Sequence, residues 1–156
     1  MTRINAVQAS SAITAAQENG VSGFTEIAIA VVQRGDQFLV GQRPAGMPLA
    51  GYWEFPGGKV HSGETTAAAA ARECLEEAGL AVDVGQQYLE TEYRYDHAAV
   101  RLHFLACQLA SSEASPCDPF RWVTAAELQG LRFPPANAEL LAMLASQHAA
   151  IQNRSC

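Results

Sequence analysis

The sequence lacks the features that mark membrane and secreted proteins. No stretch approaches the ~20 consecutive apolar residues of a membrane span, and the N-terminus has neither the charged start nor the apolar run of a secretory signal. Its cysteines form no C-x-x-C pair, and no histidine spacing suggests a zinc site. We therefore expect free thiols, a reducing compartment and a cytoplasmic location. The cysteines are Cys74, Cys107, Cys117 and Cys156.

Positive charge is also scarce. The 156 residues contain 10 Lys and Arg against 16 Asp and Glu, a formal net charge of -6. Such an acidic protein is not built for non-specific adhesion to a nucleic-acid polymer or an anionic membrane, so neither is expected as a partner. It can still bind a polyanion if a metal ion lies between them. The length and the composition, 49% hydrophobic and 17% charged, suit one compact globular domain.

The chain divides into a polar start and a core of mixed strands and helices. Residues 1–23, rich in Ala, Ser, Gln and Asn, are predicted to be a flexible N-terminal extension, and residues 24–156 the folded domain. Strands are expected within 25–43, 53–58, 86–110 and 120–123, with an antiparallel hairpin over 86–110, and helices over 64–78, 124–128 and 138–150. Gly79 is expected to be the C-cap of the first helix, and Thr124 and Glu127 are spaced as a capping box. This order lacks the regular alternation of a doubly wound sheet. It therefore predicts an α/β (α+β) fold with a mixed β-sheet sandwiched between helices.

The helix expected over 64–78 carries an unusual concentration of carboxylates. At about 100° per residue, a helical wheel predicts one buried stripe. The stripe comprises Ala67, Ala71, Cys74, Leu75 and Ala78. Glu73, Glu76 and Glu77 fall together on the opposite side, because positions i, i+3 and i+4 are neighbours on a helix.

Two interpretations of this acidic group compete. Three glutamates at such spacing often form only a solvated face. However, like charges at i, i+4 destabilise a helix by a few tenths of a kcal/mol, and this helix follows a glycine-rich loop that lets backbone approach a ligand closely. Clustered carboxylates beside a backbone carbonyl suit Mg²⁺ or Mn²⁺, which often bridge to substrate phosphates.

The segment from Gly58 to Leu80 resembles the Nudix box, G-x5-E-x7-R-E-U-x-E-E-x-G-U. The matching residues are Gly58, Glu64, Arg72, Glu73, Leu75, Glu76, Glu77, Gly79 and Leu80. Cys74 stands where a branched aliphatic residue is usual, and cysteine packs as a small hydrophobe. The resemblance to the Nudix family covers about residues 24–145 and implies the Nudix fold.

The resemblance implies a hydrolase that uses Mg²⁺, with Mn²⁺ as a substitute, to split a nucleoside diphosphate from another group. By this resemblance, Glu73, Glu76 and Glu77 are metal ligands, together with the carbonyl of Gly57. Arg72 pairs with Glu64 and holds the loop on the helix, as part of the catalytic machinery. The substrate is a small-molecule nucleotide, and the protein is a monomer or weak dimer.

Two further stretches are similar to the MutT subgroup, which removes oxidised guanine nucleotides from the pool used in DNA replication and so assists DNA repair. They are FLVGQRPAGMPLAGYWEFPGGKV, residues 38–60, and FPPAN, residues 133–137. The resemblance implies that Asn137 reads the guanine edge and that Arg43 and Phe55 line the nucleoside pocket. Lys59 can touch a phosphate. For Asn137 the alternative is a helix N-cap, for Phe55 core packing, and for Lys59 plain surface charge.

The chain departs from the subgroup at two functional positions. Pro116 stands where an acidic residue contributes to the metal site, and neither Glu113 nor Asp118 is in register to replace it. Ala98, with His97 beside it, stands where an arginine lies near the base. Three functions stay open: an 8-oxo-dGTP pyrophosphohydrolase, the same chemistry on CTP, dCTP or another nucleotide, and an inactive nucleotide-sensing domain.

Overall fold

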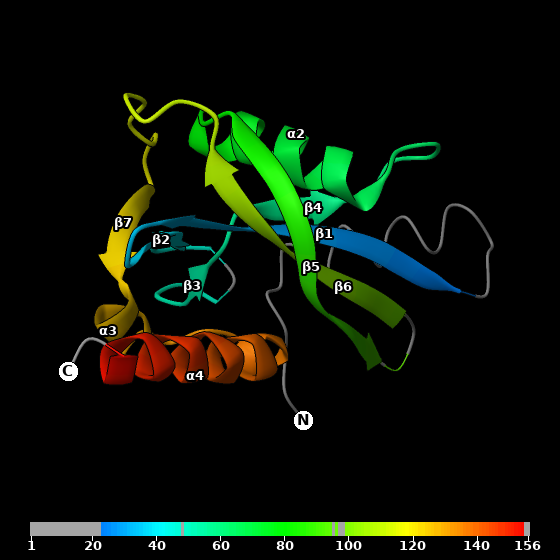
Figure 1. Ribbon diagram of the computed structural model, residues 1–156. Helices are drawn as coiled ribbons and strands as arrows, with labels where there is room; N and C mark the ends of the chain where they lie inside the picture. Colours follow the sequence, from blue (N-terminus) through cyan, green and yellow to red (C-terminus); the bar gives the residue numbers. More distant parts are fainter. Residues whose placement is uncertain (1–22, 48, 95, 97–98, 155–156) are drawn as a thin grey trace.

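The computed structural model describes residues 23–47, 49–94, 96 and 99–154 (Figure 1). The predicted extension therefore lies outside the described residues, except for Gly23. So do His97 and Ala98. No described helix is long and apolar enough to cross a membrane.

The described residues form seven strands and three α-helices. In chain order they are β1 (Phe24–Arg34), β2 (Gln37–Gln42), β3 (Trp53–Glu54), β4 (Gly57–Lys59), α2 (Thr66–Ala78), β5 (Val82–Arg94), β6 (Ala99–Leu109), β7 (Phe120–Thr124), α3 (Ala125–Leu128), the 3-10 turn η1 (Pro135–Asn137) and α4 (Ala138–Arg154). The sheet order is β3-β2-β1-β6-β5, with β4 paired to β1 and β7 to β2. β1 is parallel to β6 and antiparallel to β2 and β4, so the sheet is mixed, as predicted.

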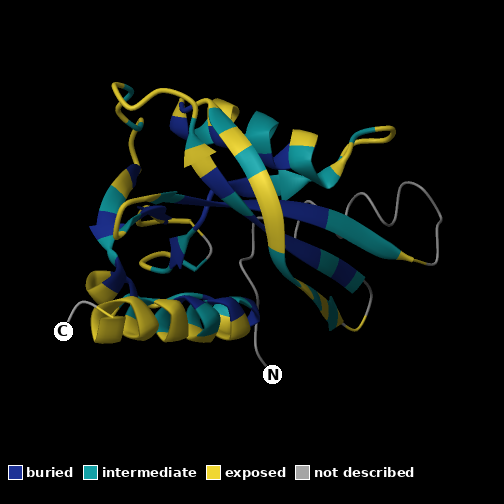
Figure 2. Ribbon diagram, viewed as in Figure 1, coloured by how far each residue is buried: buried dark blue, intermediate teal, exposed yellow. Residues whose placement is uncertain are grey.

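Alternation along β1 builds two separate cores. Ile27, Ile29 and Val31 join the cluster that includes Leu140 and Leu144 of α4. The residues between them face the other way, because successive side chains of a strand point to opposite faces. Ala28, Ala30 and Val32 pack with the buried positions of α2. Figures 1 and 2 show α2 on one side of the sheet and α4 on the other, which confirms the predicted sandwich.

Residues close in the chain define several element ends. The side chain of Thr65 caps α2 by accepting from the N–H of Ala68, and Gly79 ends the helix at φ 71°. Thr124 and Glu127 form the predicted capping box at the start of α3. β5 and β6 form the predicted antiparallel hairpin.

The predicted buried stripe of α2 was right for Cys74 and Ala78 but wrong for Leu75. Its buried positions are Ala69, Ala70, Cys74 and Ala78, whereas Leu75 is 55% exposed. On the helical wheel, Glu73 and Glu77 therefore fall within the arc of the buried residues, and the exposed Glu76 lies just beyond the Ala69 edge of that arc. Alanines fill so much of this helix that hydrophobicity gave little contrast between its faces. The face was set by close approach to Ala28 and Ala30 of β1.

Candidate active site

Arg72 of α2 connects the helix to the loop that precedes it. Its Nε and Nη2 donate to the two oxygens of Glu64 at 2.8 and 3.0 Å, and Nη2 also donates to the carbonyl of Lys59 at 3.0 Å. Glu64 accepts a further bond from the N–H of His61, and these bonds, led by that from Arg72, lower its pKa to about 2. The predicted Arg72–Glu64 pair is therefore present.

Glu73 is pressed against a glycine. A Cβ added to Gly58 would lie 2.4 Å from Oε1 of Glu73, so no larger residue fits there without moving the carboxylate. The neighbouring Gly57 is equally confined, since its Cβ would lie 2.7 Å from the carbonyl of Ala28. Both glycines lie on β4, opposite Ala28 and Ile29 of β1. The glycines of the motif thus let the sheet backbone come within reach of the helix carboxylates.

Glu73 and Glu77 form a pair of carboxyl groups in a poorly solvated position. Burial raises the pKa of Glu77 well above its usual range, and the hydrogen bond and charge of Glu73 raise it further. A hydrogen bond from the backbone of Gly57 acts in the opposite direction. Two carboxylates so placed need either a shared proton or a cation.

Glu76 does not join this pair. Its side chain is 60% exposed and lies 3.4 Å from Nη1 of Arg72, the same nitrogen that donates to Glu73 at 2.8 Å. Among the described residues, no group of three or more His, Cys, Asp and Glu side chains is already arranged to hold a metal ion. The pair of hard carboxylate oxygens against glycine backbone nevertheless fits a divalent ion such as Mg²⁺. The ligand roles of Glu73, Glu76, Glu77 and Gly57 stay predictions.

Sequence reasoning missed Glu54. Trp53 and Phe55 belong to the core cluster on the α4 side of the sheet, so the residue between them faces α2. Glu54 lies 3.4 Å from Nη1 of Arg43, and its negative charge also raises the pKa of Glu77. The alternation in the short stretch Trp53-Glu54-Phe55 was the signal that could have found it.

The predicted substrate-binding residues lie in different environments. Phe55 is buried and its ring stacks on Phe133 with centroids 5.0 Å apart, which agrees with the core-packing alternative. Asn137 is half-buried directly before α4, where its side-chain amide donates to the carbonyl of Pro134 at 3.2 Å. Lys59 is half-buried on β4.

The segment that contains Pro116 packs over the end of α2. The N–H of Cys117 donates to the carbonyl of Ala78 at 2.8 Å, and its sulfur lies against Gly79. Pro116 is half-buried, while Glu113 and Asp118 are exposed.

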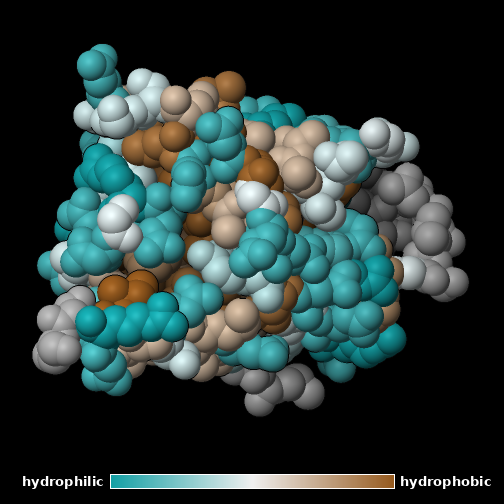
Figure 3. Space-filling view, in the orientation of Figure 1, coloured by the Kyte–Doolittle hydropathy of each residue, from teal (hydrophilic) through white to brown (hydrophobic). Residues whose placement is uncertain are grey.

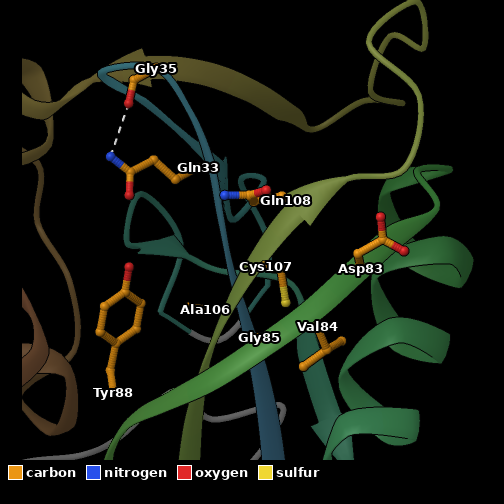
Figure 4. A pocket seen from close by; sticks show the side chains of 9 residues that line it. All are labelled: Gln33, Gly35, Asp83, Val84, Gly85, Tyr88, Ala106, Cys107 and Gln108. Atoms are coloured by element: carbon orange, nitrogen blue, oxygen red, sulfur yellow. Dashed lines mark hydrogen bonds between the residues drawn. The ribbon is translucent and has the colours of Figure 1, made fainter.

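A cavity of about 530 Å³ lies away from these residues, between β1, β5 and β6 (Figure 4). Figure 4 shows the Tyr88 ring and the Gln33 amide on one side of β5 and Asp83 on the side nearer α2. None of the predicted site residues lines this cavity.

Comparison with known proteins identifies relatives of this chain. The Mycobacterium tuberculosis protein named "Putative 8-oxo-dGTP diphosphatase 2" is 40% identical over 121 residues, which cover 73% of this chain and 83% of that protein. The "8-oxo-dGTP diphosphatase" of Escherichia coli K12 is 29% identical over 122 residues, covering 76% and 95%. The solution structure of the E. coli ORF135 protein has a TM-score of 0.69 and 28% identity, covering 84% of this chain and 95% of that one.

A structure of MutT from Staphylococcus aureus, titled a Nudix-family hydrolase, has a TM-score of 0.65 and 30% identity, covering 81% of this chain and 99% of that one. These similarities confirm the expected fold. Residues 27–143 also match the family described as the NUDIX domain. The chain belongs to the Nudix family.

Proposed function

We propose that this protein is a divalent-metal-dependent nucleoside triphosphate pyrophosphohydrolase that favours 8-oxo-dGTP. It hydrolyses this nucleotide, and dGTP, to the monophosphate and pyrophosphate and so cleans the nucleotide pool. The observation that carries the proposal is the Glu73–Glu77 pair held against the backbone of Gly57 and Gly58. The names of the relatives support the choice of substrate.

The residues that would hold the ion are Glu73 and Glu77, together with Glu76 and the carbonyl of Gly57. When bound, Mg²⁺, or Mn²⁺ in its place, neutralises phosphate oxygens and lowers the pKa of an attached water. Arg72 and Glu64 fix the loop and helix relative to each other, and a carboxylate accepts the proton of the attacking water. Water then displaces one phosphoryl group from the other.

Recognition of the nucleotide is assigned to Arg43, Phe55, Lys59 and Asn137. An amide offers both a donor and an acceptor, which suits the edge of a purine. The bond to Pro134 occupies one of the two N–H donors of Asn137, which leaves the second for a base. In this proposal, Phe55 supports the pocket wall through its stack on Phe133.

The setting of the enzyme follows from its composition. Buried Cys74 and Cys107 thiols, whose pKa values burial raises to about 12, favour a reducing cytoplasm over a disulfide-forming compartment. The acidic net charge favours a small nucleotide over a nucleic-acid polymer or a membrane. We assign residues 24–156 to the catalytic domain, residues 1–23 to an extension, and the protein to a monomer or weak dimer.

A second candidate is the same reaction on CTP or dCTP. The E. coli "CTP pyrophosphohydrolase" is 36% identical over 78 residues, which supports this alternative, and so does Pro116 in place of an acidic residue. An inactive nucleotide sensor is a third possibility, but it predicts damaged box carboxylates, and all of them are present.

One assay separates these functions. The protein is incubated with Mg²⁺ and a panel of normal and oxidised nucleotides, and the products are resolved by chromatography. Turnover of 8-oxo-dGTP far above dGTP at low substrate supports the proposal. A preference for CTP or dCTP supports the second candidate, and binding without hydrolysis supports the sensor.

The role of Asn137 has its own test. Asn137→Ala is expected to reduce discrimination between 8-oxo-dGTP and dGTP more than it reduces turnover, because the amide contacts the base and not the phosphates. The ratio of the two kcat/KM values measures this. An unchanged ratio would mean that Asn137 only shapes the start of α4.

A further inference from the structure

The Arg43–Glu54 pair lies on the same side of the sheet as the carboxylates of α2. Strand alternation turns Glu54 toward α2, because its neighbours Trp53 and Phe55 are both in the opposite core. Gly41, beside Glu54 on β2, also faces this side, since its Cβ would touch the ring of Phe120 in the α2-side core. The position of Glu54 is therefore set by the pairing of β2 with β3.

Both the backbone and the side chain of Arg43 make hydrogen bonds. Its N–H donates to the carbonyl of Tyr52 at 2.9 Å, and its own carbonyl accepts from Gly51 at 3.0 Å. Its side chain is 4% exposed, and Nη1 of its guanidinium lies 3.4 Å from the carboxylate of Glu54. A guanidinium at such a depth needs a carboxylate beside it to offset the cost of leaving water.

Glu54 also lies on the sheet face that meets the helix carboxylates. It turns toward α2, and so does Gly58 four residues later, since a Cβ there would lie 2.4 Å from Oε1 of Glu73. Arg43 therefore has its carboxylate partner on the face where Gly58 meets Glu73, which links the pocket side chain to the place where an ion fits.

We propose that Glu54 is a positioning residue of the active site. Its carboxylate holds the Arg43 guanidinium on the α2 side, so that a bound polyphosphate meets Arg43 and the ion held by Glu73 and Glu77 at once. The proposal rests on the proposed function and deepens it.

The inference predicts two linked losses in Glu54→Gln. The variant removes one negative charge from the field at Glu73 and Glu77, so Mn²⁺ affinity without nucleotide falls about threefold. It also frees Arg43 from its set position, so KM for the nucleotide rises about tenfold while kcat falls less. Glu54→Asp keeps the charge and recovers most of the Mn²⁺ affinity.

The measurements are Mn²⁺ titration followed by electron paramagnetic resonance, steady-state kinetics, and thermal unfolding. Glu92→Gln is the matched control, because Glu92 also pairs with an arginine but lies on β5. Mn²⁺ affinity and KM unchanged in Glu54→Gln, with only the Tm lowered, would overturn the proposal. If the wild type hydrolyses no nucleotide, the proposed function fails, but the Mn²⁺ affinities still decide the role of Glu54.

Discussion

Two arginines in this protein gather carboxylates around them, and the two clusters have different consequences. Arg72 contacts Glu64 in the loop before α2 and Glu73 and Glu76 on α2 itself. Arg101 of β6 contacts Glu26 of β1 and Glu90 and Glu92 of β5. The chemistry of the pairs is the same, but the surroundings are not.

Burial separates the clusters. Glu73 is 15% exposed and lies against glycine backbone, whereas Glu92 is 50% exposed at the hairpin surface. Figure 3 shows that the region around the far end of the β5–β6 hairpin is largely hydrophilic. Solvent-exposed ion pairs contribute little to stability, so the Arg101 cluster connects three strands without creating a reactive position.

The Arg72 cluster has a neighbour that the Arg101 cluster lacks among the described residues. Glu77 adds a half-buried carboxyl group beside Glu73, and its burial, together with the hydrogen bond and charge of Glu73, raises its pKa. His103 and Gln87 accompany the second cluster instead, with each ring nitrogen of His103 facing an oxygen. Two interacting carboxyl groups in a poorly solvated position distinguish a candidate active site from a structural network.

The largest expected contrast is between Glu77→Gln and Glu92→Gln. Glu77→Gln should lower kcat by at least about 100-fold, because it removes a charged ion ligand while keeping shape. Glu92→Gln should leave kcat within about twofold of the wild-type value, because water and salt screen the charge of an exposed side chain. Circular dichroism checks that both variants fold. Near-normal kcat in Glu77→Gln would remove Glu77 from the ion site.

A smaller contrast is expected for the arginines themselves. Arg72→Lys should reduce kcat/KM by about tenfold, because an ammonium cannot reproduce the two parallel bonds to Glu64 together with that to Glu73. Arg101→Lys should leave kcat/KM unchanged. Initial-rate kinetics at saturating Mg²⁺ measures both. Equal losses in the two variants would show that the clusters are not functionally distinct.

The smallest effect concerns acid stability. The pKa of Glu64 falls from 4.5 to about 2 in the folded protein, so its contribution to stability is complete above pH 4.5 and disappears as the pH falls through about 2. The gap in free energy of unfolding between wild type and Glu64→Gln should therefore narrow between pH 5 and 2. Urea denaturation at several pH values measures it, with Glu92→Gln as the control for loss of one charge. A constant gap over this range would contradict the assignment.

The most reliable predictions from the sequence came from strong local signals. Gly79 predicted the end of α2, the Thr124–Glu127 capping box predicted the start of α3, and the strand pattern predicted the β5–β6 hairpin. The box spacing predicted that Arg72 and Glu64 would meet. These features depend on residues close in the chain or on a motif with fixed spacing.

The sequence by itself determined the mixed-sheet class, the element order and the carboxylates that one helix carries, because periodicity and caps act over a few residues. Only the tertiary structure decided that Leu75 faces water, that Glu73 and Glu77 lie on the side of α2 that meets the sheet, and that Glu54 faces α2. The reason is that an alanine-rich helix has no strong preference for either face. The sheet surface formed by Ala28, Ala30 and Gly58 selects the orientation by allowing the closest approach.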